Sequence, residues 1–183
     1  EQMPGVTPFM QQQVFTGTFH SIFYRILLQH EAQKWHSSKL IKFDGEKEYV
    51  LKLAASELGI DEREFAFDQA LQQISRWKND LLSPLDVHPT DDWDISCLEL
   101  YKKYESYKEM NDKFDFDDMQ TGCYQLLKEN EHVLDFYRNR FKHFLIDEFQ
   151  DINKVQYEIV KLLASNAEDA CFVGDDDQAI YSF

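Results

Sequence analysis

The most informative segment of this chain for its fold class is FLIDEFQD, residues Phe144–Asp151. In it, an apolar run leads directly into three carboxylates. A short apolar run of four or five residues, bounded by turn signals, is typical of a strand buried on both faces. Asp147 and Glu148 stand at the carboxyl end of that strand. Neighbouring like charges repel, so these acids are either solvated in a loop or gathered around a cation.

A second apolar run, ACFVG at residues 170–174, passes into acids in the same way, at Asp175, Asp176 and Asp177. The segment between the two runs, INKVQYEIVKLLASN at residues 152–166, has the apolar spacing of a helix. Strand, helix and strand at this spacing predict a right-handed βαβ unit with parallel strands. Because ligands bind outside the carboxyl ends of parallel strands, we expect both acidic clusters to meet at one edge of the sheet.

Two interpretations of these acids remain open at this point. In the first, they are solvated loop residues, and Asp151 is the N-cap of the next helix. In the second, they bind a hard cation such as Mg²⁺ together with phosphate oxygens. Each acidic cluster contains a glutamine, in EFQD and in DDDQ, and this recurrence favours a nucleotide site.

The rest of the chain is predicted to be mostly helical. Residues Val14–Thr16 are predicted to form a short strand, followed by a helix with Thr18 as its N-cap. Between residues 35 and 112 only helical patterns occur, and one of them carries a row of tyrosines that we expect to pack in a core or interface. These tyrosines are Tyr101, Tyr104 and Tyr107. The predicted fold class is α/β, in which the first and last thirds share one parallel sheet and a helical block is inserted between them.

Composition excludes several classes of protein. The net charge of the 183 residues is −15, which opposes free-standing, non-specific nucleic-acid binding because phosphate contacts need Lys and Arg. No apolar run approaches the roughly 20 residues of a membrane span. Cys97, Cys123 and Cys171 lack the spacing of a metal site, so we expect free thiols in a reducing, cytoplasmic compartment.

Several stretches together resemble one family. LIDEFQD followed by VGDDDQAIYSF resembles motifs II and III of the superfamily 1A DNA helicases, the UvrD/Rep group. TGTFHSIFYRIL resembles the DNA-contacting segment after motif Ia of that group, and ISRWKNDLLSP and FDFDDM resemble stretches inside and just after its helical domain 1B. The resemblance covers essentially the whole chain. It implies a partial RecA-like motor domain of the P-loop NTPase type, formed by residues 1–34 and 113–183, with residues 35–112 as the 1B-like insertion.

The resemblance also implies roles in an ATP-dependent DNA helicase that moves 3′ to 5′ on single-stranded DNA and meets single-strand/double-strand junctions. Asp147 would hold Mg²⁺, Glu148 would be the general base for the water that attacks the γ-phosphate of ATP, and Gln178 would sense that phosphate. The implied DNA-contacting residues are Thr18, Phe19, His20, Ser21, Tyr181 and Phe183. The family often has tryptophan where Phe183 stands, which weakens the expected base stacking there.

The residues by themselves allow plainer roles for part of this set. His20 could simply cap or pack, and Tyr181 and Phe183 could be core residues. No phosphate loop of the form G-x-x-x-x-G-K-[ST] occurs among the six glycines. We therefore expect a piece of a longer helicase, whose remaining domains are its partners and which by itself neither hydrolyses ATP nor binds DNA well.

Two competing functions belong to other classes. A metal-dependent nuclease would use Asp147, Glu148 and Asp175 as a two-metal site, but no histidine cluster accompanies these acids. A non-catalytic interaction module would be a degenerate motor, but Asp147, Glu148 and Gln178 are all intact.

Overall fold

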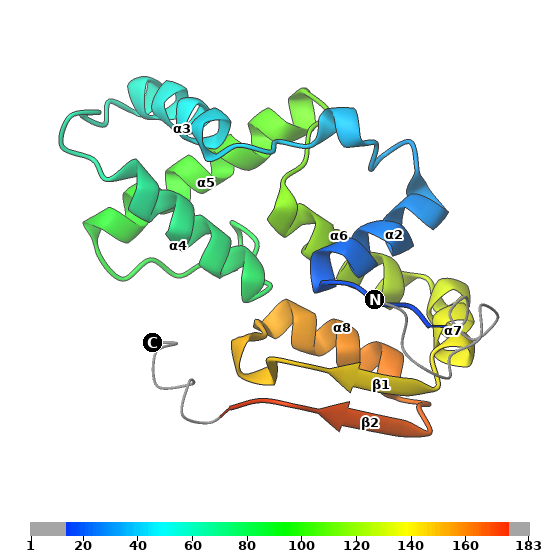
Figure 1. Ribbon diagram of the computed structural model, residues 1–183. Coiled ribbons are helices and arrows are strands. Elements are labelled where there is room, and N and C mark those ends of the chain that lie inside the picture. Colours follow the sequence, from blue (N-terminus) through cyan, green and yellow to red (C-terminus); the bar gives the residue numbers. More distant parts are fainter. Residues whose placement is uncertain (1–13, 176–183) are drawn as a thin grey trace.

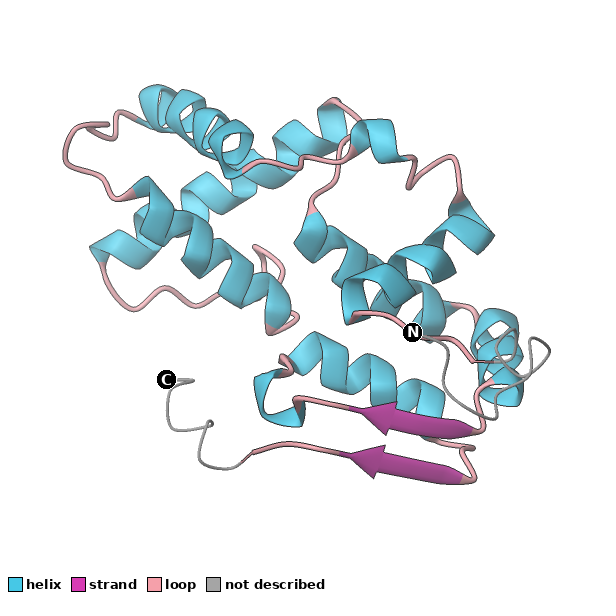
Figure 2. Ribbon diagram, viewed as in Figure 1, coloured by secondary structure: helices cyan, strands magenta, loops and turns pink. Residues whose placement is uncertain are grey.

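The structure is a computed structural model that describes residues 14–175 (Figure 1). Helices make up most of the described chain, and the strands lie together at one side of the molecule (Figure 2). The predicted site residues Asp176, Asp177, Gln178, Tyr181 and Phe183 lie outside the described residues.

The helices and strands occur in the following order along the chain. They are α2 (Phe19–Glu31), the 3-10 helix η1 (Ser37–Lys39), α3 (Asp44–Leu58), α4 (Phe67–Asn79), α5 (Asp92–Met110), α6 (Phe116–Glu129), α7 (Glu131–Arg140), β1 (His143–Ile146), the 3-10 helix η2 (Phe149–Asp151), α8 (Lys154–Ala164) and β2 (Asp169–Phe172). None of the described helices is both long and apolar enough to cross a membrane.

Strands β1 and β2 are parallel, and α8 connects them, as the sequence predicts. Their last paired residues are Ile146 and Phe172. The backbone pairing continues beyond the strands, because the Val173 amide donates to the Ile146 carbonyl at 2.8 Å and the Phe149 amide donates to the Val173 carbonyl at 2.9 Å. The two chain segments that carry acids therefore leave the sheet side by side (Figure 1).

The predicted strand at Val14–Thr16 is wrong, since these residues have no regular structure. Within residues 14–175 the sheet contains β1 and β2, and the first third of the chain contributes α2 instead of a strand. Side chains explain the difference. The Arg25 guanidinium donates to the Thr16 carbonyl at 2.6 Å and lies 3.9 Å from the centre of the Phe15 ring. The Arg25 side chain thus binds the Thr16 carbonyl, which in a strand would pair with a backbone N–H of a neighbouring strand.

Burial of the strands on both faces is also wrong within the described residues. Ile146 is buried, but its neighbour Leu145 is 75% exposed and Phe172 is 46% exposed. Successive strand residues point to opposite faces, so in β1 Leu145 lies on the open face of the sheet and Ile146 on the covered face. Strand β2 is exposed along its whole length, including Phe172, which pairs with Ile146. On the covered side, α8 packs against α6 and α7.

The buried apolar side chains form two clusters. One lies in the block of α3, α4 and α5, and it includes the predicted packing residues Tyr101 and Tyr104, with Tyr107 against its edge. The other joins α2, α6, α7 and α8. The chain enters and leaves the three-helix block at adjacent points, because the Ile41 amide donates to the Phe114 carbonyl at 2.8 Å.

Local signals explain where the helices begin and end. Five of the described α-helices have an N-cap side chain that accepts a backbone N–H from the first turn: Thr18, Asp91, Asp115, Asn130 and Asn153. Asn153 takes the place expected for Asp151, which lies in η2 instead. Helix α3 ends at its carboxyl terminus with Gly59, which has a left-handed φ of 72°. Glycine adopts this conformation without steric cost.

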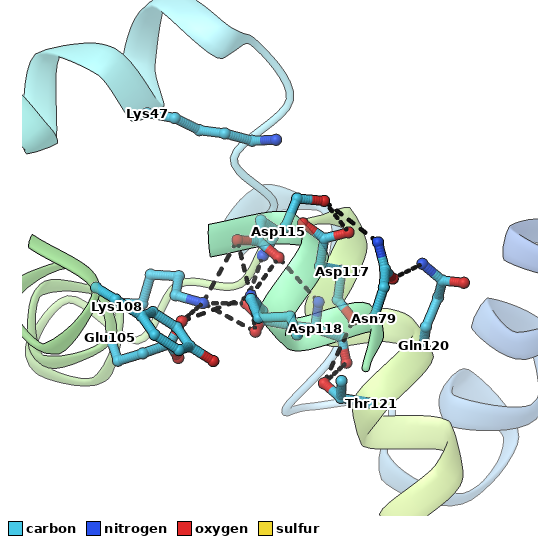
Figure 3. Close-up of polar contacts among 12 residues, drawn as sticks. Lys47, Asn79, Glu105, Lys108, Asp115, Asp117, Asp118, Gln120 and Thr121 are labelled. Carbon is cyan, nitrogen blue, oxygen red and sulfur yellow. Dashed lines mark hydrogen bonds and ion pairs between the residues drawn. The ribbon is translucent and has the colours of Figure 1, made fainter. Parts of the chain in front are cut away.

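Buried polar groups connect the three-helix block to the rest of the molecule (Figure 3). The Lys78 ammonium on α4 is 2.9 Å from an Asp115 carboxylate oxygen and 2.6 Å from one of Asp118, both on or next to α6. Lys108 on α5 also pairs with Asp118, at 2.7 Å. Lys78 and Asp115 are 3% and 2% exposed, so these charges depend on each other for compensation.

Candidate functional site

Asp147 and Glu148 follow β1 directly, and both side chains are exposed. The Glu148 amide donates to Asp147 Oδ1 at 3.0 Å, which holds the Asp147 carboxylate beside the chain. Glu148 has φ 52° and ψ 44°, in the left-handed region that residues with a side chain rarely adopt. Strained backbone of this kind is concentrated at functional sites, so this conformation is a reason to look for a role.

Asp175 follows β2 at the same edge as Asp147 and Glu148, because the two strands are parallel and in register. The prediction that two acidic segments meet at one edge of the sheet is thus confirmed for the described residues. Gln150 joins the two segments. It accepts a hydrogen bond from the Asp175 amide at 3.1 Å and donates one to Glu148 Oε2 at 2.6 Å.

The donor atoms at this edge are carboxylate and amide oxygens. Mg²⁺ is usually held by one or two carboxylates together with waters and substrate phosphates, so the residues present fit such an ion with a nucleotide. Residues 14–175 contain no group of three or more His, Cys, Asp or Glu side chains arranged to hold a metal ion. A two-metal nuclease site therefore has no support in the part of the chain that the structure describes.

The residues expected to contact DNA lie at the amino-terminal end of α2. Thr18 Oγ1 accepts from the Ser21 amide at 3.3 Å, and the Ser21 hydroxyl donates to the Thr18 carbonyl at 2.9 Å. Thr18 is thus the N-cap that the sequence predicts. Phe19 is half-buried, with its ring 5.6 Å from that of Phe23.

His20 is half-buried beside Phe116, whose ring meets the imidazole edge to face at 6.1 Å. Burial lowers the pKa of His20, although the nearby Asp117 carboxylate acts in the opposite direction. The ring is therefore uncharged at neutral pH and suits packing or hydrogen bonding better than phosphate neutralisation. Phe116 is 39% exposed at the start of α6, and no local sequence pattern marks it for a role. Only the fold brings its ring beside His20.

The cysteines form no site with these residues. Cys97 and Cys123 are buried and Cys171 is exposed, and all three are free thiols, as the sequence predicts. Burial raises the pKa of Cys97, with smaller contributions from Asp94 and Asp91, to about 12, so this thiol is unreactive.

The sequence profile of the UvrD/REP helicase N-terminal domain matches residues 6–183, which include every acidic motif described above. The chain belongs to the UvrD/REP helicase family. As the family match implies, individual relatives carry helicase names. YjcD of Bacillus subtilis, named as an ATP-dependent DNA helicase, is 46% identical over 98% of this chain and 24% of its own length.

Two further UvrD/REP relatives show the same pattern at greater distance. The ATP-dependent DNA helicase PcrA of Staphylococcus aureus (strain Mu50) is 33% identical over 93% of this chain, and DNA helicase II of Haemophilus influenzae is 33% identical over 94%. This chain spans 24% of the length of each of these relatives.

Proposed function

We propose that this chain is the part of an ATP-driven DNA helicase that supplies the acidic half of its nucleotide site. One observation carries the proposal. Parallel pairing of β1 and β2 brings the Asp147–Glu148 pair and Asp175 to a single edge of the sheet. In open α/β sheets, ligands bind at that edge.

Each acid has a separate task in this proposal. Asp147 holds Mg²⁺, which neutralises charge on the phosphates when it is bound. Glu148 accepts a proton from the water that attacks the γ-phosphate, a role that requires an exposed carboxylate within reach of that water. Gln178, from the resemblance alone, senses the γ-phosphate and couples its loss to the DNA side.

On the DNA side, the proposed contacts are those of the family resemblance. Thr18, Phe19, His20 and Ser21 line the path of single-stranded DNA, and Tyr181 and Phe183 stack against bases. The cluster of His20 and Phe116 supports this placement, because an exposed aromatic ring next to the path offers a further stacking surface. Movement 3′ to 5′ and contact with strand junctions are proposed on the resemblance alone.

The proposed division of the chain keeps its predicted boundaries, with residues 35–112 inserted into a motor formed by residues 1–34 and 113–183. The two apolar clusters support it, because one lies within the inserted segment, and the buried residues of the other lie within the motor segments except for Trp35 at the boundary. The hydrogen bond between Ile41 and Phe114 also supports it, since an inserted domain must begin and end at neighbouring points. Three free cysteines favour the proposed cytoplasmic location.

The test of this function is Glu148→Gln in the intact protein. The amide keeps the shape of the side chain but cannot accept the proton, so DNA-stimulated ATP turnover should fall by about 10²–10⁴. ATP binding should be retained. Glu129→Gln, at an exposed position on α6, is the matched control and should leave turnover unchanged. Turnover near wild type in Glu148→Gln would show that Glu148 is not the general base, whereas absence of turnover in the intact wild-type protein would favour a non-catalytic module.

The chain alone is expected to turn over no ATP. Its acids lack a phosphate loop, and the open face of the sheet at Leu145 and Cys171 has no cover among residues 14–175. An ATPase assay on the 183-residue chain with single-stranded DNA should therefore show only background phosphate release. DNA-stimulated release above a no-protein blank would contradict this expectation.

A further inference from the structure

Gln150 is the residue that physically connects the two acidic segments, and its orientation follows from its partners. The Asp175 amide can only donate, so the side-chain atom of Gln150 that faces it at 3.1 Å is the oxygen. The nitrogen then faces Glu148 Oε2 at 2.6 Å, and an ionised carboxylate can only accept. Both contacts are satisfied in this orientation, and both are lost in the flipped one.

Gly174 provides the space that this arrangement needs. A Cβ atom on residue 174 would lie 2.8 Å from Gln150 Oε1 and 3.4 Å from the Gln150 backbone nitrogen. The nearer contact is tighter than real Cβ atoms show, so a side chain at this position would push the Gln150 amide away. Glycine at position 174, two residues after β2, thus allows the Gln150 side chain to lie against the backbone.

We propose that Gln150 is a positioning residue that holds the Glu148 carboxylate in the orientation needed for catalysis. Because the Gln150 side chain is itself bound to the backbone amide of Asp175, the position of the chain at Asp175 sets that orientation. The inference rests on the proposed function of Glu148. Glu148 is exposed and lies between β1 and η2, so within residues 14–175 the Gln150 donor at 2.6 Å determines where its second oxygen points. Any shift of the backbone at Asp175 moves the Gln150 oxygen and, through the same amide, its nitrogen.

Two variants of the intact protein separate the two contacts of Gln150. Gln150→Ala removes both of them. Gln150→Glu keeps an oxygen that can accept from the Asp175 amide but replaces the donor to Glu148 by a repelling carboxylate. Supporting residues around a reaction centre typically contribute about 10–100-fold to activity, so kcat for ATP should fall by roughly that factor in both variants. KM for ATP should stay within about twofold, because the side chain orients the base without gripping the nucleotide.

A third variant, Gly174→Ala, displaces the Gln150 side chain while every polar group of the site is kept. It should lower kcat in the same way. The displaced atom is the end of a flexible side chain, so the fold should tolerate the change. Gln125→Ala, at an exposed position on α6, is the control and should match wild type. Unfolding temperatures of all variants show whether the protein remains folded.

Wild-type kcat in Gln150→Glu or in folded Gln150→Ala would overturn the proposal, as would a rise in KM without a fall in kcat. If Gln150→Ala proves unfolded, Gln150→Glu and Gly174→Ala still decide the question. Glu148→Gln, measured in parallel, distinguishes the two levels of the argument. If it leaves turnover intact, the proposed function itself fails. If it abolishes turnover while the Gln150 variants are active, only the positioning role of Gln150 fails.

Discussion

Glu148 holds a backbone conformation that disfavours any side chain with a Cβ atom. A left-handed conformation costs a residue other than glycine about 1–2 kcal/mol. The surrounding contacts compensate for this cost, because the Glu148 amide donates to Asp147 and its carboxylate accepts from Gln150. A local sequence optimised only for stability would place glycine here. Glutamate at this position is consistent with selection for the carboxylate.

Comparison of Glu148→Gly with Glu148→Ala tests this strain. Both variants lose the carboxylate, but only glycine relieves the backbone, so Glu148→Gly should be more stable than Glu148→Ala by about 1 kcal/mol. The free energy of unfolding, measured by urea titration, provides the comparison. Equal stability of the two variants would mean that φ at residue 148 is not strained in solution.

Among the elements, α8 is the one that joins the acidic edge of the sheet to the three-helix block. Its N-cap, Asn153, lies just after η2 and forms a capping box with Gln156. The side-chain Nδ2 of Asn153 also donates to Asn79 Oδ1 and to Gln120 Oε1, both at 3.1 Å. One side chain therefore begins α8 and contacts the end of α4 and the middle of α6.

Asn153→Ala should cost more stability than an ordinary cap. Loss of an N-cap typically costs about 1 kcal/mol, and each lost hydrogen bond adds roughly 1 kcal/mol, so we expect about 2–3 kcal/mol in total. Asn130→Ala is the matched control, because within residues 14–175 the Asn130 side chain only accepts from the Val133 amide at the start of α7, and its loss should cost about 1 kcal/mol. Chemical denaturation of both variants gives the difference, and equal costs would show that the contacts to α4 and α6 contribute nothing.

At the scale of the whole molecule, buried charges hold the three-helix block against α6. Burial would raise the pKa of Asp115, but the Lys78 and Lys108 ammonium groups outweigh it and hold this pKa well below its usual range. Burial likewise opposes the charge of Lys78, but Asp115, Asp118 and Glu105 raise its pKa well above the usual value. Both groups are thus charged at neutral pH, and removal of one buried partner typically costs about 3–5 kcal/mol.

This network predicts a specific loss of stability in acid. Because the pKa of Asp115 is lower in the folded than in the unfolded protein, its stabilisation is complete above the ordinary Asp value of about 3.9 and is lost as the pH falls below it. Asp115→Asn keeps an N-cap oxygen but removes the charge. It should be several kcal/mol less stable than wild type at neutral pH, with a difference that shrinks below about pH 4.

Urea titrations between about pH 2.5 and 7 measure this difference. Asp117 contributes in the opposite sense, since burial and the neighbouring Asp115 raise its pKa. The effect of burial is common to both proteins, but Asp115→Asn removes the effect of the Asp115 charge, which offsets a part of the expected loss at neutral pH. Asp91→Asn, at the exposed N-cap of α5, should change little at any pH because asparagine caps as well as aspartate. A difference between wild type and Asp115→Asn that does not depend on pH would contradict the charged network.

Features that depend only on residues close together in the sequence could be predicted without the structure. Thr18 as a cap, the end of α3 at Gly59 and the helical spacing of the tyrosines on α5 are local patterns of side chains and backbone. The common edge of Asp147 and Asp175 was also predictable, because a single crossover makes two strands parallel.

Contacts between side chains that are far apart in the sequence depend on the tertiary structure. The carbonyl of Thr16 is occupied by Arg25, which removes a strand that local pattern favoured. Lys78 meets Asp115, His20 meets Phe116, and Gln150 meets the amide of Asp175, each through packing of elements that are distant in sequence. Periodicity specifies which face of an element is buried, but the partner on that face depends on how the elements pack. The hydrogen bond between Gln150 and the Asp175 amide depends on such packing, and no local pattern indicates it.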